Sequence, residues 1–267
     1  MQIISSKENE QIKHIKKLKE KKFRDETNEF LIEGIKLVKE AIYEKQDIKQ
    51  IVICDDCEKT LDITKEEMYD IAKYNCIYVT KKIFETLTDV KAPQGILAIV
   101  KKKVENTKIN FKEDIIVALD DIQDPGNLGT ILRTVDSIGL TQLVVSKNTA
   151  DVFNPKVVRS TMGAIFRVNI IKSEDLKTSL QEIKKQGFEI VVSSLHTKNN
   201  IYDLDYKNKV IVIGNEANGV KEEIINIADK KIKIPMLGRT ESLNASVATG
   251  IILYEYVRQK LNFGDVP

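Results

Sequence analysis

The chain has 267 residues, of which 42% are hydrophobic and 31% are charged, and its formal net charge is only +2. This length suits two domains with substantial hydrophobic cores. No apolar run approaches the roughly 18 residues that a membrane-spanning helix needs, so no membrane association is expected. The first 17 residues are polar and lack the apolar centre of a signal peptide. Together with only three cysteines, this predicts a cytoplasmic protein.

Positive charge is concentrated at the start of the chain. Residues 1–24 contain eight basic and three acidic side chains. Such a cluster is compatible with a polyanionic partner, although a solvated, lysine-rich helix face is the simpler interpretation of charge alone. The spacing of Ile12, Ile15 and Leu18 predicts a helix over about residues 7–22.

A small α/β unit that ends near residue 103 is predicted next. Its elements follow the short apolar run 30–32 and are a helix over 33–45, a strand over 48–54, a helix over 64–75, and strands over 76–80 and 95–102. The segment that follows is rich in charge and poor in apolar residues, which is typical of a linker. We therefore predict a first domain over 1–105, a linker over 106–112 and a second domain over 113–267.

The second domain shows a more regular alternation of strands and helices. The continuous apolar run 115–119 is typical of a strand that is covered on both faces. Helices near 127–139 and 155–163 and after Ser242 alternate with further strands at 141–146, 189–194, 209–214 and 231–235. This pattern predicts an α/β fold with a parallel sheet, in which ligands bind beyond the carboxyl ends of the strands.

The stretch DPGNLGTILR, residues 124–133, follows the first of these strands. Asn127 is placed to cap the next helix, and Gly139 to end it. Arg133 falls on the side of this helix opposite its apolar residues. Capping by Asn127 and solvation of Arg133 would explain each residue alone, but the position after a strand also indicates a ligand site.

Two later loops have the same context. GNEANG, residues 214–219, lies between an apolar strand and a helix, but it lacks the lysine of a Walker loop and the spacing of a dinucleotide-binding loop. The third stretch, IPMLGRTESLNASVATG at 234–250, leads into a helix that we expect Ser242 to cap. Small residues run along that helix, and Gly250 within it suggests close packing against another backbone.

Taken together, these three stretches resemble the three motifs of the SpoU/TrmH RNA ribose 2′-O-methyltransferases, in order, spacing and strand context. The resemblance spans about residues 113–260. The N-terminal stretch NEQIKHIKKLKEKKFRDETNEFLIEG resembles the ribosomal-protein-like, RNA-binding substrate domain that is often fused to them. The resemblance implies a catalytic domain whose C-terminal segment forms a trefoil knot, a dimer through that domain, and a structured RNA as substrate, for which we expect 23S rRNA.

The resemblance also assigns roles to residues. It implies that S-adenosylmethionine binds in the knot, with no metal, through backbone groups. By motif position these belong to Gly214, Ile234 and Leu243, with Leu195 and Met236 nearby. It implies that Arg133 acts on the ribose hydroxyl, either as general base or, since a guanidinium keeps its proton, by stabilising the developing alkoxide or holding the phosphate. Residues that would orient Arg133 or the ribose are Asn127, Glu216, Ser242 and Asn244.

Other candidates are less specific. Arg159 and Arg167 lie in a further segment that matches the family and are candidates for RNA phosphate contact, as are Lys13 and Lys17, although each could be a surface charge. Cys54 and Cys57 form a C-x-x-C pair, but the chain has no second pair, so we expect two half-buried cysteines at a strand end rather than a metal or redox site.

Three alternative functions stay open at this stage. They are a tRNA ribose methyltransferase, a non-catalytic RNA-binding protein on the same fold, and an enzyme that acts on a small molecule through the glycine loops. The intact motif residues favour catalysis over the second, and the basic N-terminal segment favours RNA over the third.

Overall fold

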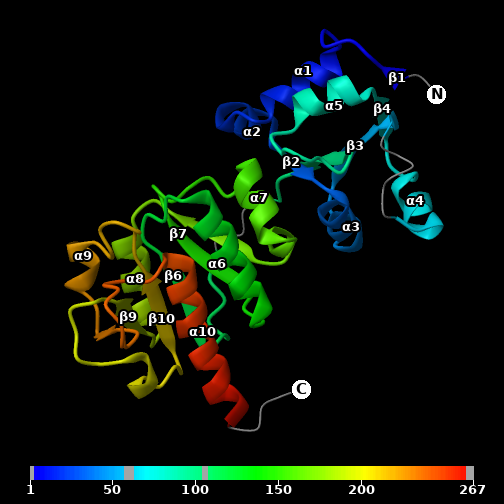
Figure 1. Cartoon of the computed structure of the whole chain (residues 1–267). Coiled ribbons are helices and arrows are strands. Elements are labelled where there is room, and N and C mark those ends of the chain that lie inside the picture. Colours follow the sequence, from blue (N-terminus) through cyan, green and yellow to red (C-terminus); the bar gives the residue numbers. More distant parts are fainter. Residues whose placement is uncertain (1–2, 57–62, 104–107, 263–267) are drawn as a thin grey trace. The chain divides into compact units, whose positions relative to one another are not determined.

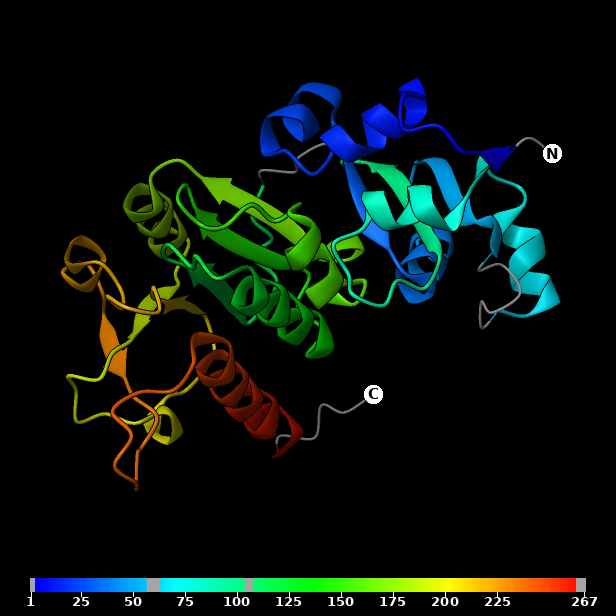
Figure 2. The same ribbon diagram turned by 45° about the horizontal axis from the view of Figure 1, so that its top comes forward.

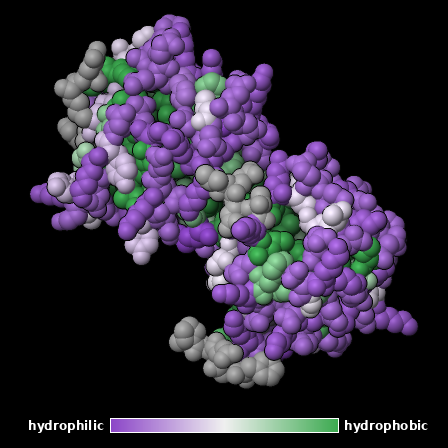
Figure 3. Space-filling model, turned by 180° about the vertical axis from the view of Figure 1, so that it is seen from behind, coloured by the Kyte–Doolittle hydropathy of each residue, from purple (hydrophilic) through white to green (hydrophobic). Residues whose placement is uncertain are grey.

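A computed structural model describes residues 3–56, 63–103 and 108–262. The chain packs as two compact units (Figures 1 and 2). Unit 1 comprises Met1–Val104 and Asp151–Phe166, and unit 2 comprises Glu105–Ala150 and Arg167–Pro267. Seen from behind, the surface is mostly hydrophilic, and apolar residues cover smaller areas of it (Figure 3). None of the described helices is long and apolar enough to cross a membrane.

Unit 1 is built on a five-stranded mixed sheet with strand order β1-β4-β3-β5-β2. Helices α1 and α5 cover one face of this sheet and α3 covers the other (Figure 1). Its elements are β1 (Ile3–Ile4), α1 (Glu10–Lys17), α2 (Lys21–Thr27), β2 (Glu29–Glu33), α3 (Ile35–Tyr43), β3 (Ile48–Cys54), α4 (Lys65–Ile71), β4 (Cys76–Val79), α5 (Lys81–Leu87), β5 (Ile96–Lys101), α7 (Pro155–Thr161) and the 3-10 turn η2 (Ala164–Phe166).

The single helix predicted over 7–22 is wrong, because the segment forms two helices. Helix α1 ends at Lys17 with Leu18 as its cap, and α2 begins at Lys21. The apolar stripe predicted for the first helix is nevertheless buried, with Ile12, Ile15 and Leu18 fully inside the core. The break between the helices exposes backbone carbonyls, and the buried Arg24 side chain donates to those of Leu18 and Lys19.

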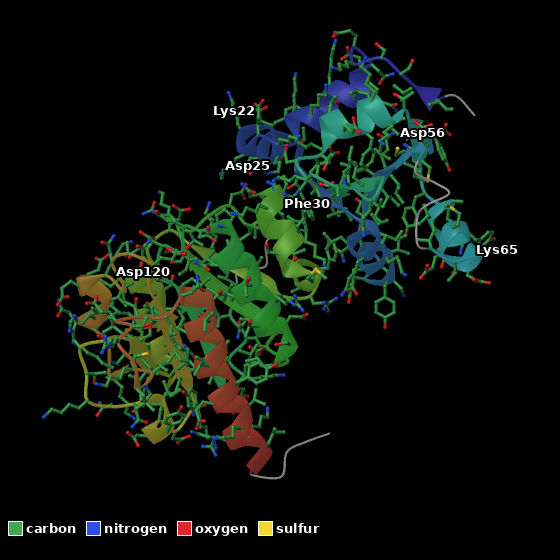
Figure 4. The ribbon with its side chains drawn as sticks, viewed as in Figure 1. Lys22, Asp25, Phe30, Asp56, Lys65 and Asp120 are labelled. Carbon is green, nitrogen blue, oxygen red and sulfur yellow. The ribbon has the colours of Figure 1, made fainter. Side chains whose placement is uncertain are left out.

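Segment Asp151–Phe166 packs with unit 1, although in the sequence it comes between two strands of unit 2. Buried Arg24 forms an ion pair with Asp151, and Phe30, labelled in Figure 4, packs on Phe153 with ring centroids 4.9 Å apart. The predicted functional domains, 1–105 and 113–267 with a linker over 106–112, stay a prediction. The observed packing differs from it because ion pairs and ring contacts hold 151–166 on the first unit.

Unit 2 is built on a six-stranded sheet with order β11-β9-β10-β6-β7-β8. Every pair of neighbouring strands is parallel, which confirms the predicted sheet. Its elements are β6 (Ile115–Leu119), α6 (Pro125–Ser137), β7 (Gln142–Ser146), β8 (Asn169–Ser173), α8 (Leu176–Lys185), β9 (Glu189–Ser193), the 3-10 turn η3 (Ile201–Asp203), β10 (Lys209–Ile213), α9 (Glu222–Ile225), β11 (Lys230–Ile232) and α10 (Ala245–Asn262).

Alternation along the central strands sends side chains to both faces of this sheet. Ile116 and Ala118 of β6 pack with Leu180 of α8 and Ile224 of α9 in one core. On the other side, α10 lies beside α6 in both ribbon views (Figures 1 and 2). Because neighbouring strands of this sheet are all parallel, β6, β10 and β11 end at one edge of the sheet, where the loops after them carry the three candidate motifs. The trefoil knot stays a prediction.

The ion pair that fixes Asp151–Phe166 gives a test of this packing. Asp151→Ala leaves the buried Arg24 guanidinium without its counter-charge, so we expect the free energy of unfolding to fall by about 3 kcal/mol. Lys22→Ala serves as a control, since Lys22 is 88% exposed in its pair with Glu26 and its loss should change stability by less than about 0.5 kcal/mol. Urea unfolding compares the two, and equal effects would contradict the role of the pair.

Candidate active site

One cleft of about 520 Å³ lies between the loops that follow β9, β10 and β11 and the start of α10. All five residues predicted to contact the cofactor line it: Leu195, Gly214, Ile234, Met236 and Leu243. Three of the five predicted catalytic residues line it as well: Glu216, Ser242 and Asn244. The structure therefore brings together residues from two of the three motifs that are up to 30 positions apart in the sequence.

Asn127 connects the remaining motif to these two. Its side-chain nitrogen donates to Glu216 Oε1 at 2.8 Å, and its side-chain oxygen accepts from the Asn244 amide, also at 2.8 Å. Asn127 itself is only 7% exposed. Since a carboxylate only accepts, the amide nitrogen of Asn127 must face Glu216, and its oxygen must then face Asn244. One buried amide thus joins all three motifs.

Asn244 has a second task, because it caps α10. Its side-chain oxygen accepts from the backbone nitrogens of Ser246 and Val247 and from the Ser246 hydroxyl. The prediction that Ser242 caps this helix is therefore wrong: α10 begins at Ala245, and Ser242 is an exposed residue of the preceding loop. Capping fixes the Asn244 side chain, so its amide nitrogen points to Asn127.

The start of α6 also differs from the expectation. The helix begins at Pro125, and its cap is Asp124, whose side chain accepts from the backbone nitrogen of Asn127 at 2.8 Å. Asn127 is therefore inside the first turn and does not cap the helix. The sequence held a signal for this arrangement, since Pro is favoured at the first helical position directly after an Asp cap. Gly139 does end the helix, with φ of +78°.

Glu216 is held in its ionised form by donors from the first motif. Burial alone would raise the pKa of its carboxyl, but hydrogen bonds from Asn127 and from the backbone nitrogens of Gln123 and Asp124 outweigh it and lower the pKa. The carboxylate is therefore charged at neutral pH and is a weak base. Its stabilising contacts are present above the ordinary glutamate pKa of about 4.3 and are lost as the pH falls through its lower pKa in the fold.

The loop after β10 is closed on itself. Asn215 and Gly219 exchange backbone hydrogen bonds of 2.9 Å in both directions, and the Asn215 side chain accepts from the nitrogens of Ala217 and Asn218. A β-carbon on Gly214 would lie 2.1 Å from the Gly219 carbonyl carbon, so only glycine fits there. The sequence had marked both glycines but gave no reason for them.

Arg133 is not part of this constellation. It is exposed on α6, outside the cleft lining, and makes no hydrogen bond or ion pair to another residue in the described part of the chain. Arg133 is six positions after Asn127, which is about 9 Å along the helix axis and about a third of a turn around it. The cleft of one chain therefore holds the orienting residues without the arginine.

The predicted RNA contacts are engaged within the protein. Arg159 is 3.3 Å from Glu33, and Arg167 forms a two-pronged pair with Asp136. Lys13 pairs with Glu8 and Glu10, which raise its pKa. Lys17 lies over the Phe23 ring, 5.6 Å from its centroid. Each stays a prediction as an RNA contact.

The cysteine pair is only partly described. Cys54 is fully buried at the end of β3 rather than half-buried, and Cys57 lies outside the described residues. Among the described residues, no group of His, Cys, Asp and Glu side chains has an arrangement that could hold a metal ion.

Both parts of the chain match families of known proteins. Residues 114–254 match the SpoU rRNA Methylase family, and residues 9–98 match the MRM3-like substrate binding domain. The chain is 32% identical to the 23S rRNA (guanosine(2553)-2′-O)-methyltransferase of Bacillus subtilis, over 95% of this chain and 98% of the relative. It is 42% identical, over 60% of its length, to the tRNA (guanosine(18)-2′-O)-methyltransferase of Aquifex aeolicus, of which 76% is covered.

Solved structures agree with these relatives. The chain resembles the AdoMet-bound rRNA methyltransferase of Sinorhizobium meliloti with a TM-score of 0.84 and 31% identity, over 97% of this chain and 98% of that one.

Two glycines of the cleft loops give a matched test of the loop geometry. Gly214→Ala forces a β-carbon into the Gly219 backbone and should lower the free energy of unfolding by about 1–3 kcal/mol. A β-carbon on Gly238 would have no neighbour within 4 Å among the described residues, so Gly238→Ala should change stability by less than about 0.5 kcal/mol. Thermal unfolding measures both, and a tolerated Gly214→Ala would disprove the close contact.

Proposed function

Because the chain belongs to the SpoU rRNA methylase family, we propose that it transfers the methyl group of S-adenosylmethionine to a ribose 2′-OH of a structured RNA. The 23S rRNA methyltransferase of Bacillus subtilis aligns with 95% of the chain, whereas the tRNA methyltransferase of Aquifex aeolicus aligns with 60%, which favours 23S rRNA as substrate over tRNA. The observation that carries the proposal is the buried Asn127 amide, which joins the three motifs beside the cleft.

The cleft suits S-adenosylmethionine in size and in chemistry. Its volume of about 520 Å³ falls in the range of roughly 300–1,000 Å³ typical of small-molecule sites. Apolar side chains such as Ile213, Ile234 and Ile252 offer a surface for the adenine, and the loops at Gly214 and Leu243 bring backbone groups to the cleft edge. We assign cofactor binding to Leu195, Gly214, Ile234, Met236 and Leu243.

The reaction is mainly a problem of alignment. S-adenosylmethionine supplies a methyl group on a sulfonium, which is electrophilic without a metal. The protein has to hold the ribose oxygen in line with it, and alignment of this kind contributes several kcal/mol to rate acceleration. We assign this orienting role to Asn127, Glu216, Ser242 and Asn244. Because a guanidinium keeps its proton, Arg133 is better suited to stabilise the developing alkoxide than to remove the proton itself. The 2′-OH proton is released to water as the oxygen–methyl bond forms, and the sulfur–methyl bond breaks to leave S-adenosylhomocysteine.

The position of Arg133 supports a homodimer through unit 2. Val247, Ile251 and Tyr254 form an apolar stripe along α10 and are 50%, 36% and 53% exposed. The Tyr254 hydroxyl lies 3.5 Å from Ser137 of α6, the helix that carries Arg133. We propose that a second copy of the chain covers this stripe, and that each Arg133 then reaches the cleft of the other copy.

RNA capture is proposed for unit 1, on the evidence of its match to a substrate binding domain and its basic N-terminal helices. The phosphate-contact candidates are Lys13, Lys17 and Arg159 of unit 1, together with Arg167 at the start of the second segment of unit 2. Lysine contacts to phosphate would make binding fall steeply with salt. The proposal places the protein in the cytoplasm, with rRNA as its substrate.

The test is transfer of label from S-adenosylmethionine to total unmodified RNA, followed by digestion to nucleosides. We expect label in a 2′-O-methylnucleoside of the 23S rRNA fraction. Label in the tRNA fraction would show that the substrate is a tRNA and not 23S rRNA. Label on a base, or transfer to RNA that carries a 2′-deoxy nucleotide at the target, would overturn the reaction.

Substitution of Arg133 tests its role. Arg133→Lys keeps the charge but loses the planar, forked donor, so we expect turnover to fall nearly as far as in Arg133→Ala, by roughly 100-fold or more. The Kd for S-adenosylmethionine should stay within about twofold, because cofactor binding is assigned to five other residues that line the cleft and Arg133 is assigned to the ribose oxygen. Near-normal turnover in Arg133→Lys would reject this role.

Mixing two inactive variants tests whether Arg133 acts in the partner. A heterodimer of Arg133→Ala and Glu216→Ala would contain one site with both residues intact, so equal mixtures should recover about a quarter of wild-type activity. If Arg133 serves its own cleft, no site is restored and the mixture stays inactive. Light scattering should show a dimer at micromolar concentration.

A further inference from the structure

Two aspartates and a lysine meet where the loop after β10 returns to the sheet. Asp120 and Asp121 directly follow β6, and Lys221 ends the loop that contains Glu216. Lys221 Nζ lies 2.7 Å from Asp121 Oδ2 and 3.3 Å from Asp120 Oδ1, and the Lys221 backbone nitrogen donates to Asp120 Oδ2 at 2.8 Å. We call these three residues the Asp120–Asp121–Lys221 cluster.

Asp120 is the residue of this cluster that most needs a counter-charge. It is fully buried at the end of β6 and is labelled in Figure 4. Its Oδ1 has no hydrogen bond in the described part of the chain, so the ammonium of Lys221 at 3.3 Å is the counter-charge on that side. A buried carboxylate without a cation is strongly unfavourable, and this ties the end of the loop to the first strand of the sheet.

Asp121 ties down the beginning of the same loop. Its backbone has a φ of +55°, an unusual conformation for a residue with a side chain. The Ser146 hydroxyl fixes that turn, because it accepts from the Asp121 nitrogen and donates to Asp121 Oδ1. The turned Asp121 carbonyl accepts from the Asn215 side chain at 2.8 Å. Asp121 therefore holds both ends of the loop, Asn215 through its backbone carbonyl and Lys221 through its carboxylate, and Asp120 holds Lys221 as well.

Between these two anchors lie the groups that the reaction uses. Gly214 to Val220 line the cofactor cleft, and Glu216 projects from the middle of the loop to Asn127. A loop fixed at both ends but without regular structure depends on its anchors for its position. Loss of one anchor would therefore shift the cleft wall and leave the sheet intact.

We infer that Lys221, through Asp120 and Asp121, is a positioning residue that sets the loop 214–220 for cofactor binding. The inference rests on the function proposed above. Lys221 does not line the cleft and touches none of the reacting atoms, so its effect passes through the loop. A positioning role predicts a selective change in cofactor affinity, whereas a purely structural ion pair predicts only a change in melting temperature.

The full-length protein carries the test. Lys221→Met keeps the aliphatic stem and removes the charge, and we expect the KM for S-adenosylmethionine to rise roughly 10-fold while the KM for RNA changes less than about twofold. Lys221→Arg, which can still bridge both carboxylates, should recover most of the affinity. Asp121→Asn, measured as a second variant, should raise the same KM.

Lys184→Met is the matched control. Lys184 pairs with Asp229 at 2.6 Å and is 45% exposed, against 43% for Lys221, but neither Lys184 nor Asp229 lines the cleft. We expect it to leave the KM for S-adenosylmethionine unchanged. An unchanged KM in Lys221→Met, or an equal rise in Lys184→Met, would overturn the inference.

Calorimetry on the wild type separates this inference from the proposed function. Failure of the wild type to bind S-adenosylmethionine would overturn the proposed function, and the inference with it. Binding by the wild type that Lys221→Met retains in full would overturn the inference alone.

Discussion

The arrangement of the cleft depends on one buried amide. Asn127 must donate to a carboxylate and accept from a second amide, and only a side chain with a donor and an acceptor side by side can do both. Its position in the first turn of α6 is fixed by the Asp124 cap, and Asn244 is fixed because it caps α10. Two helix starts and one loop are thereby held in register around the cleft.

The fold explains why such a joint is possible. In an all-parallel sheet the strands end at the same edge, so loops that are far apart in sequence become neighbours there. The loop after β10 is further held by Asp120, Asp121 and Lys221, so its position does not depend on Glu216 alone. A rigid cleft wall is what a methyl transfer limited by alignment requires. Arg133 lies outside the cleft lining, and this is why we propose that a second chain completes the site.

Much of this could be predicted from the sequence, and the failures have physical causes. The apolar runs located five of the six strands of unit 2 but missed β8, whose apolar run is only Ile170 and Ile171. The five cofactor candidates do line one cleft, because strand context fixes where loops emerge. The two misassigned caps, at Asn127 and Ser242, arose because several capping residues stood within a few positions and only the backbone path selects one. The attachment of 151–166 to unit 1 could not be foreseen, since it depends on a buried ion pair between residues 127 positions apart.

The most direct measurement of the central claim is a double-mutant cycle on the Asn127–Glu216 hydrogen bond, with methyl transfer as the readout. Asn127→Asp places two carboxylates in contact and should slow transfer roughly 10- to 100-fold. Adding Glu216→Gln reverses the direction of the hydrogen bond, because the new amide can donate to the new carboxylate, which can still accept from Asn244. The account predicts that the double variant is faster than Asn127→Asp alone, with a coupling free energy above about 1 kcal/mol. Losses that simply add would show that this hydrogen bond does not organise the site.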